Sequence, residues 1–591
     1  MNMVDSQRRN PKGVSSLWKV LAALCVLALA SVLAACGGDD SKSSSGGSQE
    51  IDELPVSDAG DLGEPVPAIK VIGPSPGYDP DENEAMQLMV DAMKEIGLKV
   101  EYQGFPDFTS LADATAANDF GDFAIVSAGY LGNVDRLEPS ALLTPTFTCD
   151  AVGDSNWSGY CRDEFDQLLA DANAELDEGA RKELIDEIQD LLADDLPMLV
   201  LYHPAVPAVY NSSDVSDVVL SPAAAYFHFQ NLVEANPADG AITVGASEAG
   251  APLNPMCNEG SYFQTYEYQG LIYDRLTRID AEGNPQLWMA ESIERDGDTT
   301  VVVKLRDGLE FSNGDPVTAD DVKFTYDYIN EWKVGYYAGP LGHVKSISTE
   351  GDDTVIFELK DAYAQIEAEL FGRVGILPKS IWENVVEKEG LKHPCDYQKH
   401  DFIGSGPYTL DYYDPAQGIR LLRNDGYFEP ANAKEIIGRV YSSQQSLFQD
   451  LLAGEVDFTD SDPGFTPSQI SQAEGNSNLT VEDVETLTVR FMQFNLRDGS
   501  PFQDLALRTA VGHMLDSGQI VGGILAGRGT AGAGIIAPAN TRWHNEEVEF
   551  PAYNPQQAVE VLTEAGYGWD ESGRLHFPSD HEPQVFAEAA E

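Results

Sequence analysis

Apolar and polar positions in the first part of the chain switch repeatedly between two periods. Between residues 65 and 201, short apolar runs that suit buried strands alternate with segments in which apolar residues recur every three or four positions. The pattern predicts strands at 69–72, 98–102, 122–126 and 197–202, and helices at 84–96, 163–175 and 178–193. This alternation is typical of an α/β unit in which helices cover a sheet.

Strand patterns are more frequent in the middle of the chain, and helices return at its end. The predicted strands of residues 241–495 are 242–244, 299–305, 354–359, 408–413 and 419–422, and the predicted helices are 266–276 and 320–328. Thr318 is expected to cap the second of these helices. Further helices are predicted at 505–515, 517–525 and 555–565. The length of 591 residues fits about two to four folding units.

The first 36 residues have the pattern of an export signal. Basic residues precede an apolar stretch, 20–35, whose 16 residues are fewer than the roughly 20 that a membrane-spanning helix needs. Small residues then precede Cys36, as in a bacterial lipobox, and a Ser/Gly-rich segment follows. We therefore expect a lipoprotein signal peptide at 1–36, lipidation of Cys36 and a flexible tether at 37–60. The alternative is an ordinary signal peptide with a stray cysteine.

Charge and cysteines narrow the class of protein further. The 98 acidic and 36 basic residues give a formal net charge of −62, which repels phosphate backbones, so nucleic-acid binding is not expected. Cys149, Cys161, Cys257 and Cys395 remain outside the signal segment, where they are disulfide candidates. Cys149 and Cys161 lie close in sequence around a polar loop, which leaves Cys257 and Cys395 as the other pair by elimination.

Two common sequence signatures of enzymes are missing from this chain. No HExxH or P-loop occurs, and the nine histidines have no metal-ligand spacing. Residues 527–532 spell GxGxxG, but they follow a predicted helix instead of a strand, so a mobile loop is a better interpretation than a dinucleotide site. We expect neither an enzyme nor a cofactor-binding or metal-binding protein.

Several segments of residues 241–580, taken in order, resemble family 5 of the extracellular solute-binding proteins, the peptide- and nickel-binding subunits of ABC importers. The matching segments are 301–322, with its Arg306-Asp307-Gly308 turn, and 376–379, 404–408, 452–457, 494–496, 507–511 and 558–567. The resemblance implies an α/β, two-lobed fold of the type II periplasmic-binding-protein kind, with an extra subdomain in lobe I.

The order of the segments differs from the family's order. Residues 66–235 resemble the family's C-terminal part, yet they precede the part that normally comes first, and each part occurs once. A circular permutation explains this order, because exposed loops tolerate new termini; a misassembled gene is the alternative. The resemblance then implies that 61–201 and 496–591 form lobe II, and that 202–495 form lobe I with a subdomain inserted at about 265–400. Hinge crossings are expected near 201–203 and 494–496.

The resemblance also supplies candidate ligand-binding residues in lobe II. In dipeptide binders of the family, an aspartate after a Trp-x-Gly motif holds the α-ammonium of the peptide, because a desolvated cation needs a fixed counter-charge. The matching residues here are Tyr130 and Asn133, with Asp135 two positions later. Asn133 carries no charge, so either Asp135 replaces the aspartate or the ligand has no free amine there. Tyr130 either stacks on the ligand or packs in the core.

The corresponding loop of lobe I supplies the remaining candidates, Asn254, Ser261 and Tyr262. Together the resemblances imply a monomer, lipid-anchored on the extracytoplasmic face of the membrane, that captures di- or oligopeptides for an ABC permease and its ATPase. The alternatives are a nickel-chelate or oligosaccharide binder of the same family and, from other classes, an exported hydrolase or a sensor on this scaffold.

Overall fold

The computed structural model describes residues 51–580 with short gaps at 52, 59, 61, 108–109, 112–113, 116–123, 131–136, 154, 224, 247–252, 258–262, 335–336, 398–401, 460–464 and 533. Residues 50–591 form one compact unit, which is the unit described below. Its described residues contain no helix that is both long and apolar enough to cross a bilayer.

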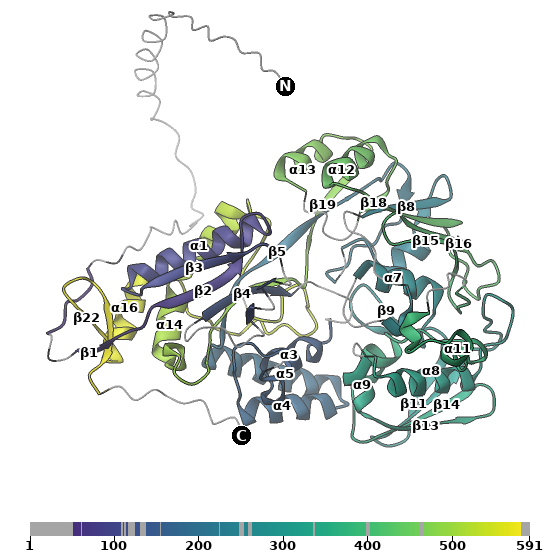
Figure 1. Cartoon of the computed structure of the whole chain (residues 1–591), viewed down its shortest axis with the longest axis horizontal. Coiled ribbons are helices and arrows are strands. Elements are labelled where there is room, and N and C mark those ends of the chain that lie inside the picture. Colours follow the sequence, from purple (N-terminus) through teal and green to yellow (C-terminus); the bar gives the residue numbers. More distant parts are fainter. Residues whose placement is uncertain are drawn as a thin grey trace, which may run out of the picture. The chain divides into compact units, whose positions relative to one another are not determined.

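A seven-stranded mixed sheet collects strands from distant parts of the chain (Figure 1). Its order is β19-β5-β20-β4-β2-β3, and β21 also pairs with β5. β2, β3 and β4 are mutually parallel, whereas β20 runs antiparallel to both β4 and β5. The strands are β2 Ile69–Pro74, β3 Val100–Phe105, β4 Ala124–Tyr130, β5 Met198–Tyr210, β19 Thr480–Glu485, β20 Val489–Gln493 and β21 Gly529–Ala531.

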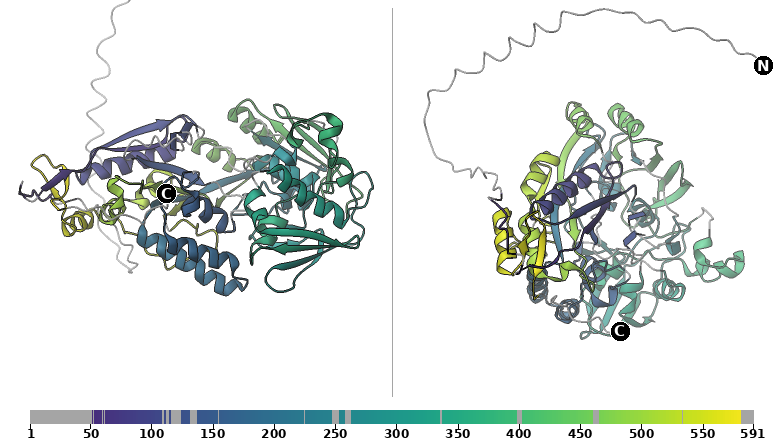
Figure 2. Two further views of the ribbon diagram at one scale, coloured as in Figure 1. Left: turned by 60° about the horizontal axis from the view of Figure 1, so that its bottom comes forward. Right: turned by 60° about the vertical axis from the view of Figure 1, so that its left-hand side comes forward.

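Helices accompany this sheet, as the alternating pattern predicts. They are α1 Pro80–Glu95, α3 Ser140–Phe147, α4 Asp163–Ala174, α5 Glu178–Asp195, α14 Leu505–His513 and α16 Pro555–Glu564. α4 and α5 run side by side (Figure 2). α1 buries Met86, Met89 and Met93, which lie on the predicted apolar face. It begins earlier than predicted because Asp79 accepts a hydrogen bond from the Glu82 amide and Pro80 suits the first helical position.

The second large group of elements is built on two further sheets. One sheet has the order β15-β16-β17-β8-β18, with β8 parallel to its neighbours β17 and β18, and the other is antiparallel with the order β11-β12-β14-β13. The strands are β8 Ala241–Ala246, β11 Ala290–Arg295, β12 Thr300–Leu305, β13 Val344–Glu350, β14 Thr354–Leu359, β15 Tyr408–Asp414, β16 Gly418–Arg423, β17 Glu435–Val440 and β18 Phe458–Thr459. The helices include α6 Phe229–Glu234, α7 Phe263–Ile272, α8 Ala319–Trp332, α12 Gln444–Ala453 and α13 Pro467–Glu474.

Two main hydrophobic cores divide these elements into two lobes. One core draws its buried residues from between Ala208 and Val484, and we call the elements around it lobe I. The other combines 66–202 with 489–575, and we call its elements lobe II. The protein therefore has a two-lobed α/β fold, and one lobe is assembled from both ends of the described chain.

The chain passes between the two cores twice. β5 contributes Tyr202 to the lobe II core and Ala208 to the lobe I core, next to the expected crossing at 201–203. The return passage lies between Val484 and Val489, earlier than the expected 494–496. The reason is that β20 already pairs with β4 and β5, so its side chains pack in the lobe II core.

The N-terminus of α8 shows how local sequence sets an element boundary. Thr318 and Asp321 form a capping box, in which each side chain bonds to the backbone of the other residue. The prediction that Thr318 caps this helix is confirmed, although the helix extends to Trp332, beyond the predicted 328.

Two sequence predictions near residue 520 are corrected by the structure. The helix predicted at 517–525 is only a short α15, Ser517–Gln519, followed by a wider π-helical turn, Ile520–Ile524. The GxGxxG segment is not simply a loop, because Gly529–Ala531 form β21 at the edge of β5. A Cβ on Gly532 would lie 1.9 Å from the carbonyl oxygen of Val200, so close strand pairing accounts for that glycine.

The two ends of the described chain meet in a small sheet. β1, Leu62–Pro65, pairs antiparallel with β23, Leu575–Pro578, which also pairs with β22, Gly568–Trp569. The Val66 amide donates to the Leu575 carbonyl oxygen. Residues that open the described chain and residues that close it therefore stabilise one another.

Two disulfides link the four described cysteines. Cys149 bonds to Cys161 across 12 residues, and Cys257 bonds to Cys395 across 138 residues. The second bond ties the turn after β8 to the segment before β15, so it closes the part of lobe I between these two segments into one covalent ring.

A buried carboxylate supports the edge of the lobe I sheet. Asp457, just before β18, accepts hydrogen bonds from the Thr243 amide (2.8 Å) and from the Asn211 Nδ2 (3.1 Å). Burial, together with the nearby Asp214 and Asp239, raises the pKa of Asp457 to about 6. Its folded pKa thus lies above the unfolded value of about 3.9, so this group adds stability as the pH falls through about 6.

We expect Asp457→Asn to remove this pH dependence. The unfolding free energy of the wild type relative to the variant should rise by on the order of 2 kcal/mol between pH 7.5 and pH 4.5. Urea unfolding at several pH values measures the difference, and comparison with the variant cancels the other titrating groups. A difference that does not vary with pH would contradict this assignment.

Candidate functional site

Both parallel strand groups end where the sequence places candidate ligand-binding residues. In lobe II, β2, β3 and β4 end at Pro74, Phe105 and Tyr130 and run in one direction, so their carboxyl ends share an edge of the sheet. In lobe I, β8 and β17 end in the same way at Ala246 and Val440. Ligands of open α/β sheets bind outside such carboxyl ends, which marks these two edges as the candidate site.

The candidate residues of lobe II follow the end of β4. Tyr130 is the last residue of that strand, and its backbone pairs with Val489 of β20, while its side chain lies outside the described part. Asn133 and Asp135 fall in the next segment, outside the described residues, as do Ser261 and Tyr262 of lobe I. The structure therefore fixes the strand from which the first pair departs.

Asn254 is the one candidate whose side chain is described, and it is buried. Its Nδ2 donates to the carbonyl oxygens of Pro394 (2.9 Å) and Tyr397 (3.0 Å), and its Oδ1 accepts from the Met256 amide (2.9 Å). These bonds fasten the turn Pro255–Cys257 to the segment that carries Cys395. In this arrangement Asn254 positions the loop that follows β8.

An ion cluster at the carboxyl end of β2 was not among the sequence predictions. Arg490 of β20 lies 3.4 Å from an oxygen of Asp79 and 3.3 Å from an oxygen of Glu82, at the start of α1. Burial raises the pKa of the neighbouring Tyr78 hydroxyl, and Arg490 opposes that rise. The Asp-Pro signature of the helix start was visible in the sequence, but its pairing with a residue some 400 positions later was not.

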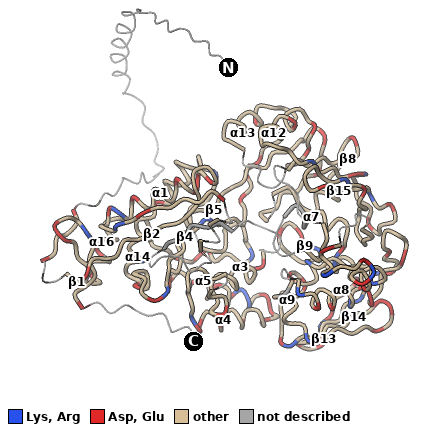
Figure 3. The backbone as a smooth tube through the Cα atoms, viewed as in Figure 1, with Lys and Arg blue, Asp and Glu red and all other residues tan. Residues whose placement is uncertain are grey.

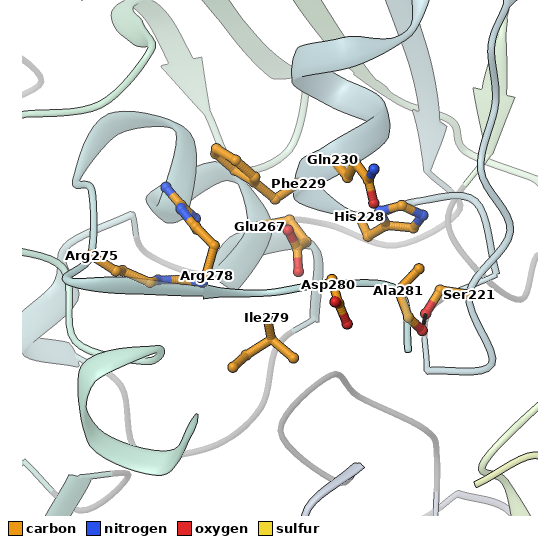
Figure 4. A pocket seen from close by; sticks show the side chains of 10 residues that line it. All are labelled: Ser221, His228, Phe229, Gln230, Glu267, Arg275, Arg278, Ile279, Asp280 and Ala281. Atoms are coloured by element: carbon orange, nitrogen blue, oxygen red, sulfur yellow. Dashed lines mark hydrogen bonds between the residues drawn. The ribbon is translucent and has the colours of Figure 1, made fainter. Parts of the chain in front are cut away.

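A small pocket with many polar lining residues lies in lobe I between α6, α7 and β9, Thr277–Ile279 (Figure 4). Its lining residues are Ser221, His228, Phe229, Gln230, Glu267, Arg275, Arg278, Ile279, Asp280 and Ala281. The Asp280 carboxylate accepts bonds from the Asn284 backbone and the Gln286 side chain, and the Ser221 hydroxyl donates to the Ala281 carbonyl oxygen. Burial lowers the pKa of His228 to about 4, so this imidazole is neutral at pH 7.

Arg278 in this pocket belongs to a buried network. Its guanidinium bonds to the Asp274 carboxylate at 2.5 Å and lies 3.4 Å from the ring centre of Phe229. Asp274 also accepts from Trp288 Nε1 and from the Tyr427 hydroxyl. Burial lowers the pKa of Arg278, and Asp274 opposes that shift. Asp274 balances the charge of Arg278, whereas the buried Nη1 of Arg278 has no hydrogen-bond partner among the described residues.

A second, largely apolar pocket lies at the carboxyl ends of β8 and β17. It is lined by Ala246, Leu253, Tyr268, Tyr413, Pro415, Gly418, Ile419, Gly438, Arg439 and Val440. Leu253 immediately precedes Asn254, so this pocket borders the loop that carries the lobe I candidates. Within the described residues, no cluster of three or more His, Cys, Asp or Glu side chains is arranged to hold a metal ion.

Comparison with known proteins identifies the family. Residues 284–590 match the family described as "Bacterial extracellular solute-binding proteins, family 5 Middle". The oligopeptide-binding protein AppA of Bacillus subtilis is 29% identical over 307 residues, covering 51% of this chain and 55% of AppA. The glutathione-binding protein GsiB of Shigella flexneri is 26% identical over 314 residues, covering 50% and 56% of the two chains.

Among solved structures, AppA from Bacillus subtilis in complex with a nonapeptide is 26% identical, with a TM-score of 0.44 and coverage of 56% of this chain and 64% of that one. NikZ from Campylobacter jejuni in complex with Ni(L-His) is 18% identical, with a TM-score of 0.43 and coverage of 57% and 65%. The match spans between half and three fifths of the length of these curated relatives. The family match covers more than half of this chain, and the chain therefore belongs to family 5 of the bacterial extracellular solute-binding proteins.

Proposed function

We propose that this protein captures peptides outside the cytoplasm and delivers them to an ABC permease and its ATPase. The observation that carries the proposal is the family match over residues 284–590. Two relatives, AppA and OppA of Bacillus subtilis, are named oligopeptide-binding proteins, which favours peptides over other solutes of the family. Two α/β lobes joined by two chain passages suit capture by closure, because each lobe supplies contacts that the ligand gains only in the closed state.

For the peptide amine we propose Asp135 as the counter-charge. Tyr130 ends β4 at the carboxyl edge of the lobe II sheet, and Asp135 follows it within the same connection. A desolvated ammonium requires a fixed negative partner, and Asn133 cannot supply one. Tyr130, Ser261 and Tyr262 are proposed as further contacts, with Asn254 as the residue that positions their loop.

We expect Asp135→Asn to weaken binding of tri-alanine by about 30-fold or more, since removing one partner of a desolvated charge pair costs about 2–5 kcal/mol. Isothermal titration calorimetry measures the change. The matched control is Glu187→Gln, an exposed acidic residue on α5, which should leave affinity unchanged. N-acetylated tri-alanine should bind the wild type poorly. Equal affinity of both peptides for both forms would contradict the assignment, and so would a wild type that binds neither peptide.

A second candidate solute is a nickel chelate, favoured by Asn133 at the position where an amine-binding aspartate is expected. A chelate of this kind needs no fixed counter-charge for an ammonium. Calorimetric titration with Ni(L-His) separates the two proposals. A binder of nickel chelates should release heat that saturates at one equivalent of Ni(L-His), whereas a peptide binder should show no such saturation.

We also propose that Cys36 carries a lipid and anchors the protein to the extracytoplasmic face of the membrane. Support comes from the basic start, the short apolar stretch and the small residues before Cys36. The order of parts is proposed to be a circular permutation, with lobe II divided between the two ends of the described chain. The pairing of β1 with β23 supports it, because new termini opened within one lobe should lie next to each other.

A further inference from the structure

A group of buried hydrogen bonds joins lobe II to a segment of lobe I. Gln365, with 2% of its surface exposed, donates from Nε2 to the Ser140 Oγ (3.0 Å) and to the Asn173 Oδ1 (2.5 Å). The neighbouring Ala364 amide donates to the Asn173 carbonyl oxygen at 2.9 Å. The Ser140 hydroxyl in turn donates to the Asn173 Oδ1 at 2.6 Å. We call these four residues the polar seam.

The two sides of the polar seam belong to different cores. Ser140 begins α3 and Asn173 lies in the last turn of α4, two helices whose apolar side chains pack in the lobe II core. Gln365 lies between Tyr363 and Ile366, and both of these pack in the lobe I core. The three bonds donated by Gln365 and Ala364 therefore break whenever the lobes separate, while each core stays intact.

Two charge pairs flank the polar seam, one on each lobe. Arg181 bonds to Glu138 in lobe II, and Arg373 lies 3.9 Å from Glu369 in lobe I, with all four residues buried. Burial raises the pKa of Glu369, and Glu138 across the seam adds to the rise, whereas Arg373, Arg181 and a hydrogen bond from Tyr363 oppose it. Each pair keeps its partner if the lobes part, so separation leaves no charge alone.

The polar seam also buries a polar atom at a cost in free energy, and separation of the lobes would remove that cost. Among the described residues, the buried Oε1 of Gln365 has no hydrogen-bond partner, and water could reach it only after the lobes part. The free energy gained from the seam hydrogen bonds and the free energy lost by burying these polar groups are of similar size. Such a contact suits a reversible latch better than a permanent interface.

One seam residue follows the lobe II candidates in the chain. Ser140 begins α3, the next α-helix after β4, whereas Asn173 lies on α4 and Gln365 lies before the π-helical turn Ile366–Phe371. A small apolar cluster of Leu137, Ala223 and Leu487, with Ile279 packed on it, is a second contact between elements of the two lobes.

We propose that the polar seam is a latch that holds the lobes together without help from the solute. The closed form is then populated before any solute binds, and solute affinity rises with that population. The proposal concerns closure itself, so it stands or falls separately from the identity of the solute.

Double electron–electron resonance tests the latch through spin labels on Glu183→Cys in α5 and Glu294→Cys in β11, both at exposed positions. The protein is first freed of bound small molecules by unfolding and refolding with its disulfides intact. The wild type should show a populated short distance. Gln365→Ala should lower the ratio of the short to the long population about tenfold, as expected for the loss of two buried hydrogen bonds.

Gln189→Ala is the matched control. Its buried amide donates to the carbonyl oxygens of Trp543 and Ile185, which both lie in lobe II, so this variant should lower the melting temperature without changing the distances. Ser140→Ala should shift the distances as Gln365→Ala does, and combining the two should add little. An unchanged distribution in Gln365→Ala, an equal shift in Gln189→Ala, or a wild type found only at the long distance would each overturn the proposal.

Discussion

Replacing Cys257 and Cys395 together by serine is expected to lower the free energy of unfolding by about 3–5 kcal/mol. The bond closes a ring of 138 residues, and closing a ring restricts the unfolded chain more as the ring grows. The disulfide also holds the turn Pro255–Cys257, which the Asn254 side chain fastens to Tyr397. Loss of the disulfide is therefore expected to weaken this hydrogen bond as well. Urea unfolding followed by tryptophan fluorescence measures the loss.

The shorter disulfide provides the control for this prediction. Cys149 and Cys161 are 12 residues apart, and the ring-size term predicts that their replacement costs about 2 kcal/mol less than loss of the larger ring. Equal losses in the two double variants would contradict ring closure as the source of the stabilisation.

Arg508→Met is expected to destabilise lobe II by about 3–5 kcal/mol, in the range found when a buried charge loses its partners or leaves them unpaired. Arg508 is fully buried, and burial lowers its pKa to about 10, so it remains charged at pH 7. Its guanidinium donates to the carbonyl oxygen of Asp195 at 3.1 and 2.7 Å and to that of Gln503 at 3.0 Å. Methionine fills similar space but leaves these carbonyl groups buried without a donor.

Arg420→Met tests whether burial is the reason for that effect. Arg420 pairs with Asp411 and Glu435 on the surface, where solvent screens the interaction. Its loss should cost less than about 1 kcal/mol. Thermal unfolding of both variants decides the matter, and similar shifts in melting temperature would show that the buried carbonyl contacts are not what makes Arg508 important.

Local elements follow from local sequence to a large extent. The strand predicted at 354–359 matches β14, and the Thr318 cap is found where its spacing to Asp321 places it. The predictions at 517–525 and 527–532 were wrong because they used only the local sequence. The segment at 517–525 has the apolar content of a helix, but its glycines favour a wider turn, and the strand character of 529–531 arises only from pairing with β5.

The candidate site was less accessible from sequence because its contacts are long-range. Asn254 lies in a segment that resembles a ligand loop, yet its side chain bonds to residues some 140 positions later. Arg490 meets Asp79 only because β20 inserts between β4 and β5. The early return passage to lobe II has the same cause, since the resemblance placed it at 494–496 but β20 already pairs with β4 and β5.

Acidic residues are spread over both lobes (Figure 3). A net charge of −62 keeps such a protein soluble without specifying its ligand. We propose that specificity depends on a few groups at the two carboxyl edges, with Asp135 as the anchor for a peptide amine.

Native mass spectrometry of residues 37–591, purified without refolding, tests the central proposal most directly. Denaturation then releases whatever the protein carries, and the released masses are measured. Peptide capture predicts a spread of small masses whose fragmentation shows amino-acid residues with free amino termini. A single non-peptide mass, or a protein that emerges empty and takes up no peptide from a tryptic digest of casein, would contradict it.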